Sequence, residues 1–90
     1  MNYDLQTYKN VFFCFNTYRT GLKVGDVIQP QILMARLRLM PDVAHEILDA
    51  MEKDGLLTQE SLNTNSSLGS IGNVWRLTKI GYEFYIKNCL

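Results

Sequence analysis

Hydrophobic residues recur at steps of three and four along several stretches of the chain, a spacing that predicts amphipathic helices. The first stretch covers residues 4–18, and its main apolar face consists of Leu5, Tyr8, Phe12 and Phe15. The apolar surface extends beyond this face through Val11, Phe13, Cys14 and Tyr18. A helix that is apolar over most of its surface is buried over most of its surface. We therefore expect the outer side of this helix to be covered by a second subunit.

Two prolines mark the starts of two helices in the middle of the chain. Upstream of them, Gly21 and Gly25 lie in a polar segment that ends the first helix. Pro30 begins a short helix that runs to Leu39. Pro41 fits a first helical position equally well, because its missing N–H would have no partner within the helix.

The helix that begins at Pro41 is predicted to run to about Asp54. Its inner face consists of Ala44, Ile47, Leu48 and Met51. Met40 is a poor N-cap, so the start depends on Pro41 and on Asp42 near the positive end of the helix dipole. Gly55 is expected to close the helix as a left-handed C-cap.

The last third of the chain predicts a β-hairpin followed by a helix. Leu56, Leu57 and Thr58 open one strand, and the segment 74–77 returns as the other. The Asn-, Ser- and Gly-rich segment 63–73 between them is expected to be a loop. Thr78 is a good N-cap for a final helix over 78–90. The predicted fold class is therefore α+β, mostly α.

Composition limits the chain to one small globular domain. Its 90 residues are 47% hydrophobic and 20% charged, which is typical of globular proteins and too short for two domains. The longest apolar run has five residues, against about 18 for a membrane span, and no signal peptide is visible. Two cysteines, Cys14 and Cys89, are too few for a disulfide framework or a zinc site. We expect a single cytoplasmic domain over 1–90 that binds no metal or cofactor and no membrane.

The zero net charge conceals three segments of different sign. Residues 1–40 hold five basic and two acidic side chains, a balance of +3. Residues 41–55 hold one basic and five acidic side chains, a balance of −4, and residues 56–90 have a balance of +1. The acidic segment coincides with the helix that is predicted to begin at Pro41.

The order of the predicted elements resembles a winged helix-turn-helix, with a three-helix core, a two-stranded wing and a C-terminal helix. The segment 28–39 resembles the first helix of the helix-turn-helix pair, and 40–48 resembles the turn and the recognition helix. The segment 51–57 resembles the end of that helix before the first wing strand. The segment 75–84 is similar to the second wing strand and last helix of small MarR- and PadR-like transcriptional regulators.

This resemblance implies a homodimeric regulator of transcription that binds double-stranded DNA in a sequence-specific way. The recognition helix would enter the major groove, and the wing would lie along the backbone or the minor groove. The residues that the resemblance assigns to DNA are Arg36, Arg38, Asp42, Val43, His45, Glu46, Asp49, Asn65, Ser66, Arg76 and Lys79. Arg19 and Lys23 are further candidates for contacts with the flanking backbone.

The acidic recognition helix departs from the family pattern, in which these positions usually carry Ser, Thr, Arg, Gln or Lys. Lys and Arg side chains that neutralise phosphates supply most of the affinity for DNA, and a helix with a balance of −4 is repelled by the duplex. Glu46 or Asp42 can still accept a hydrogen bond from a cytosine amino group. The alternative is a winged-helix domain that binds a basic protein, as an anti-repressor or an assembly subunit would.

The first and last helices, over 1–20 and 78–90, are expected to form the dimer interface. The residues predicted for it are Tyr3, Val11, Phe13, Cys14, Tyr18, Tyr82, Tyr85 and Ile86. An apolar small-molecule pocket between these helices is the other interpretation of their aromatic side chains. No nucleophile or carboxylate pair lies in a catalytic motif, so we do not expect an enzyme. His45 is either a solvated helix residue or a contact to a base or phosphate.

Overall fold

The computed structural model describes residues 3–62 and 72–90 of the chain. The elements in chain order are α1 (Leu5–Phe13), β1 (Val27–Ile28), α2 (Pro30–Leu37), α3 (Pro41–Lys53), β2 (Leu57–Leu62), β3 (Gly72–Leu77) and α4 (Lys79–Cys89). The fold is α+β and mostly helical, as the sequence predicts. The predicted loop, with Asn65 and Ser66, lies largely outside the described residues. No helix of the described part is both long and apolar enough to cross a bilayer.

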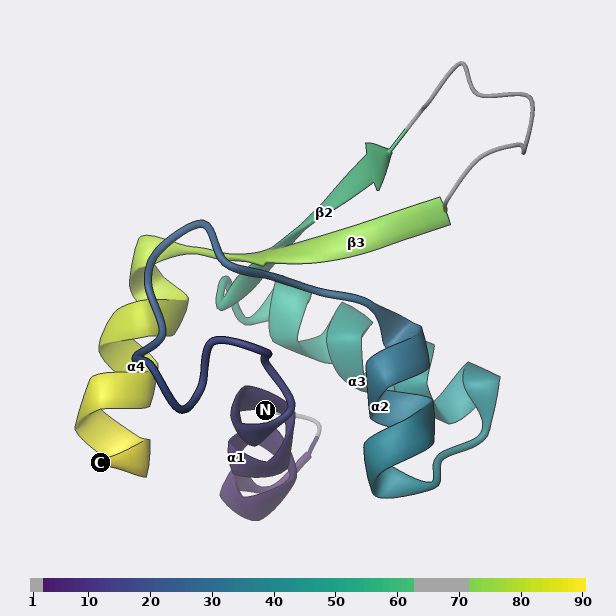
Figure 1. Cartoon of the computed structure of the whole chain (residues 1–90), viewed down its shortest axis with the longest axis horizontal. Coiled ribbons are helices and arrows are strands. Elements are labelled where there is room, and N and C mark those ends of the chain that lie inside the picture. Colours follow the sequence, from purple (N-terminus) through teal and green to yellow (C-terminus); the bar gives the residue numbers. More distant parts are fainter. Residues whose placement is uncertain (1–2, 63–71) are drawn as a thin grey trace.

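The three strands form one antiparallel sheet in the order β1-β3-β2. The central strand β3 pairs Trp75 with Ile28 of β1 on one side and with Gln59 of β2 on the other. The strands β2 and β3 extend beyond the helices, as Figure 1 shows. The sequence did not predict β1, because a strand of two residues has too short a pattern to be recognised and depends on a distant partner.

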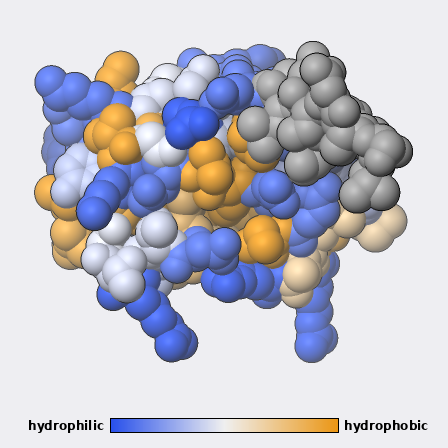
Figure 2. Space-filling view, turned by 45° about the horizontal axis from the view of Figure 1, so that its top comes forward, coloured by the Kyte–Doolittle hydropathy of each residue, from blue (hydrophilic) through white to orange (hydrophobic). Residues whose placement is uncertain are grey.

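The core lies between the sheet and the helices. Its largest fully buried side chains are Trp75, Tyr8, Phe12, Phe15, Leu33, Leu48 and Met51. An aromatic cluster joins α1 to α4, since the ring of Phe12 lies 5.4 Å from that of Tyr85 and 6.1 Å from that of Phe84. On the face shown in Figure 2, hydrophobic residues lie in small groups that hydrophilic residues separate.

Two polar side chains cap helices, and the sequence predicts the one at Thr78. Asp4 is the N-cap of α1, and its Oδ1 accepts a hydrogen bond from the Thr7 N–H at 2.9 Å. The hydrogen bonds from Thr7 also lower the pKa of the Asp4 carboxyl. Thr78 is the N-cap of α4 and accepts from the Gly81 N–H at 2.9 Å. The same hydroxyl lies 2.6 Å from the Gly55 carbonyl oxygen and 2.9 Å from that of Leu56, both in the α3–β2 connection.

The predicted bounds of two helices were too long. The first helix ends at Phe13 and not at Tyr18, because the chain continues in turns. In one of these turns the Tyr18 N–H donates a hydrogen bond of 3.1 Å to the Phe15 carbonyl oxygen. The helix α2 ends at Leu37 and not at Leu39, because Arg38 takes the left-handed conformation with φ 55°. The end of α3 is confirmed: Gly55, with φ 81°, is left-handed directly after the helix.

Candidate functional site

The helix α3 has a buried face and an acidic outer face. The predicted inner residues are confirmed, since Ala44, Ile47, Leu48 and Met51 are all at most 4% exposed. The outer face carries the exposed side chains of Asp42, His45, Glu46, Asp49 and Lys53. At 100° per residue, Asp42, Glu46, Asp49 and Lys53 lie within about 60° of one another around the helix axis. The outermost line of α3 thus contains three carboxylates and one ammonium group.

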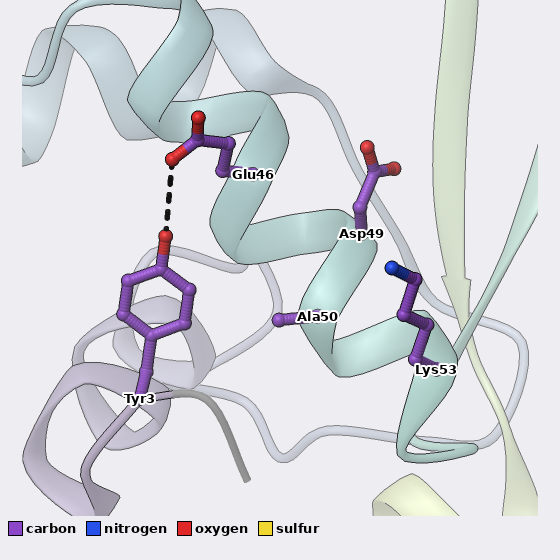
Figure 3. A pocket seen from close by; sticks show the side chains of 5 residues that line it. All are labelled: Tyr3, Glu46, Asp49, Ala50 and Lys53. Carbon is purple, nitrogen blue, oxygen red and sulfur yellow. Dashed lines mark hydrogen bonds between the residues drawn. The ribbon is translucent and has the colours of Figure 1, made fainter.

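A hollow of about 400 Å³ lies beside this line, between α3 and Tyr3, which lies two residues before α1. It is lined by Tyr3, Glu46, Asp49, Ala50 and Lys53, which Figure 3 shows. The Tyr3 hydroxyl donates a hydrogen bond of 3.3 Å to Glu46 Oε2. Partial burial, together with the charge of Glu46 and the hydrogen bond to it, raises the pKa of the Tyr3 phenol. The hollow is therefore polar: its carboxylates offer hydrogen-bond acceptors, and the Lys53 ammonium group offers a donor.

Not all acidic groups of the segment 41–55 are available to a partner. The Glu52 carboxylate accepts a hydrogen bond from the Gln59 N–H of β2 at 3.2 Å. The Asp54 carboxylate accepts from the Tyr8 hydroxyl at 2.7 Å, which joins the end of α3 to α1. Both carboxylates keep their charge, but part of their hydrogen-bonding capacity is used within the fold.

His45 lies at the sheet side of the outer face. Its ring is 5.8 Å from the indole of Trp75 at an interplanar angle of 75°, and its Nδ1 is 2.7 Å from the Pro41 carbonyl oxygen. With the proton on Nδ1, the ring donates to that carbonyl and is fixed against the helix. Trp75 is fully buried, and among the described residues its indole Nε1 has no hydrogen-bond partner. His45 is therefore an exposed residue that packs on the base of the hairpin.

Arg76 is held within the sheet by three polar contacts. Its Nε and Nη2 each lie 2.8 Å from Glu60 Oε2, and its Nη1 donates to the Gly25 carbonyl at 2.7 Å. These contacts neutralise the charge of Arg76 and fix its direction. The side chains of Arg38 and Lys79 are exposed, in the α2–α3 turn and at the start of α4. These three cations thus lie on different elements, and Arg76 is the one that is ion-paired within the described residues.

Arg36, in the last turn of α2, lines a second hollow of about 500 Å³. The hollow is lined by Phe13, Phe15, Asn16, Tyr18, Arg19 and Arg36. Local sequence patterns did not predict that Arg36 and Arg19 line one cavity, because the two residues are far apart in the chain and only the tertiary fold brings them together. Asn16 was missed for the same reason.

The residues predicted for a dimer interface divide into two groups. Val11, Cys14 and Tyr85 are at most 5% exposed in the single chain, so its own core covers them and they offer little surface to a second copy. Burial also raises the pKa of the Cys14 thiol, against a smaller lowering by the charge of Arg36. Phe13, Tyr18 and Ile86 remain exposed, and Tyr3 and Tyr82 are half-buried. The single chain thus supplies much of the cover that we expected from a second subunit.

The described residues contain no group of three or more His, Cys, Asp or Glu side chains that would hold a metal ion. The candidate site is thus a surface, formed by the acidic line of α3, the α2–α3 turn and the β2–β3 hairpin. No protein family matches the chain, and comparison with curated proteins and with solved structures gives no significant match.

Proposed function

We propose that the chain is a winged-helix protein that binds double-stranded DNA as a homodimer and regulates transcription. The observation that carries this proposal is the order of the elements. A helix pair joined by the three residues 38–40 is followed by an antiparallel hairpin, and the sheet has the order β1-β3-β2. This order is similar to that of the MarR- and PadR-like regulators.

In this proposal the N-terminal part of α3 enters the major groove. Pro41, Asp42, His45 and Glu46 are exposed there. The carboxylates would accept hydrogen bonds from cytosine amino groups, and the hairpin β2–β3 would follow the backbone. Arg38 in the α2–α3 turn is the cation best placed for a phosphate, because Arg76 is already paired with Glu60.

The scarcity of free cations gives the proposal a quantitative test. With Arg36 and Arg38 as the phosphate contacts of each copy, a dimer neutralises about four phosphates, and log K falls with log salt at a slope of about −4. Arg38→Gln should reduce this slope by about 2, and the matched substitution Lys87→Gln, on the exposed end of α4, should leave it unchanged. Titration of labelled duplex fragments at several salt concentrations measures both. A confirmed dimer that shows no salt-dependent binding, even at low salt, would refute the proposal.

The dimer in this proposal is built through α4. Tyr82, Ile86 and Leu90 are spaced by four residues along one side of this helix, and Ile86 is 41% and Leu90 79% exposed. An apolar stripe at this spacing is suited to pack against the same stripe of a second copy.

A second candidate function is the binding of a basic protein, and the acidic line of α3 favours it. Asp49 makes no polar contact with another described residue, and Asp42 contacts only the Val43 N–H of its own helix turn, at 3.0 Å. The double substitution of Asp42 and Asp49 by lysine should abolish binding of a lysine-rich peptide and strengthen binding to a DNA duplex. Glu83→Lys on α4 is the matched control. Peptide binding that survives the double substitution would exclude this function.

A further inference from the structure

The second hollow differs from the α3 surface in both charge and composition. It lies between the turn that follows α1 and the last turn of α2, and it encloses about 500 Å³. This volume is within the range of about 300–1,000 Å³ that small-molecule sites occupy. It lacks any carboxylate, whereas two of the five residues of the hollow at α3 are acidic.

One wall of the hollow is an exposed aromatic pair. The rings of Phe13 and Tyr18 lie 4.8 Å apart with an interplanar angle of 58°, and each side chain is 38% exposed. The ring of Phe15 is 1% exposed and belongs to the core beneath. Exposed rings next to a cavity offer a face on which a planar group can stack, and every nucleobase has such a face.

The remaining lining residues present hydrogen-bond donors. Arg19 and Arg36 are both exposed, and within the described ranges neither forms an ion pair with a carboxylate. Two unpaired guanidinium groups at one cavity favour an anion, and their forked donors match the oxygens of a phosphate. Asn16 adds an amide that both donates and accepts hydrogen bonds, as the edge of a base requires.

We propose that this hollow binds a nucleoside 5′-monophosphate. The phosphate is held by Arg19 and Arg36, the base stacks on the Phe13–Tyr18 pair, and the Asn16 amide contacts the edge of the base. The hollow shares only Arg36 with the phosphate contacts proposed for the duplex, so its other lining residues test nucleotide binding independently of DNA binding.

Isothermal titration calorimetry with 5′-AMP, adenosine and inorganic phosphate tests the proposal. Both halves of the ligand contribute, so 5′-AMP should bind at least about tenfold more tightly than adenosine or phosphate alone. A single-stranded trinucleotide with a 5′-phosphate shows whether the ligand is a free nucleotide or the 5′ end of a strand. Tight binding of 5′-AMP or of the trinucleotide supports the proposal that the hollow binds a 5′-phosphorylated nucleoside.

The variants Arg19→Gln and Tyr18→Ala should each weaken the binding of 5′-AMP by about tenfold. Lys23→Gln is the matched control, since Lys23 is an exposed cation of the same connection that does not line the hollow. Arg19 is exposed, so its substitution leaves the core intact even if Tyr18→Ala disturbs the fold. Three results would overturn the proposal: phosphate that binds as tightly as 5′-AMP, an Arg19→Gln variant with unchanged affinity, or no binding at millimolar concentration. Because Arg19 is not one of the phosphate contacts assigned to the duplex, duplex binding by Arg19→Gln should be close to that of the wild type, which separates the two proposals.

Discussion

Replacement of Gly81 by alanine tests the packing of α4 against the α3–β2 connection. Glycine in the interior of a helix costs about 1 kcal/mol relative to alanine, so helix propensity alone predicts that Gly81→Ala stabilises the protein. The structure predicts the opposite. A Cβ at this position would overlap the carbonyl oxygen of Leu56 and would lie only 2.8 Å from Leu77 Cδ1.

The Leu56 carbonyl cannot easily move away from this Cβ. It accepts hydrogen bonds from the Thr78 N–H at 3.1 Å and from the Thr78 hydroxyl at 2.9 Å, so a shift of the connection weakens both. Overpacking of a core typically costs about 1–3 kcal/mol, and each weakened hydrogen bond adds about 1 kcal/mol. After subtraction of the gain in propensity, we expect a loss of about 2–4 kcal/mol. For a chain of this size, the lower value of about 2 kcal/mol already corresponds to a fall in Tm of roughly 8–16 °C.

Urea denaturation and thermal unfolding followed by circular dichroism measure this loss. Glu83→Ala is the control, because Glu83 is exposed on the same helix and its substitution should change the stability by less than about 0.5 kcal/mol. A Gly81→Ala variant that is as stable as the wild type, or more stable, would refute the close approach of α4 to Leu56.

Three further predictions concern the core, the thiols and the dimer. Tyr8→Phe should cost about 1 kcal/mol at pH 7, because it removes the hydrogen bond to Asp54. Burial and Asp54 raise the pKa of Tyr8 in the folded state, so the stability that its hydroxyl contributes is complete below about pH 10 and is lost as the pH rises further. The difference in unfolding free energy between the wild type and Tyr8→Phe should therefore be smaller above about pH 10 than at pH 7 in denaturation experiments. A difference that stays constant would contradict this reasoning. Cys14 is 3% exposed whereas Cys89 is partly exposed, so a thiol reagent should modify Cys89 first and Cys14 only on unfolding; equal rates in the native protein would show that the turn after α1 opens readily. Ile86→Asp should convert a dimer to a monomer in light scattering with little change in the circular dichroism spectrum, and a persistent dimer would place the interface elsewhere than on α4.

Local signals in the sequence account for most of the helix bounds. Pro41, Gly55 and Thr78 each have a conformation or a hydrogen bond that their own chemistry favours, and the structure confirms each of them at the predicted place. The end of α1 was not predictable in this way, since Phe15 and Tyr18 continue the helical spacing but contribute to a compact turn instead.

The candidate sites depend on distant contacts and were therefore less predictable. The amphipathic pattern of α3 identified its outer face, because burial alternates with the helical period. The pattern did not indicate that Arg76 pairs with Glu60 and donates to the Gly25 carbonyl, or that Arg19 and Arg36 share a cavity. Such pairs are formed by the tertiary fold, and no local spacing encodes them.

The position of the Thr78 hydroxyl, between α4 and the α3–β2 connection, has a mechanical consequence. Its contacts with Gly55, Leu56 and Gly81 join the α3–β2 connection to the first turn of α4 at a single atom. A force that tilts the hairpin should therefore also move the start of α4. In a dimer that packs through α4, this junction would fix the distance and angle between the two α3 helices, and with them the spacing of the two half-sites on a duplex.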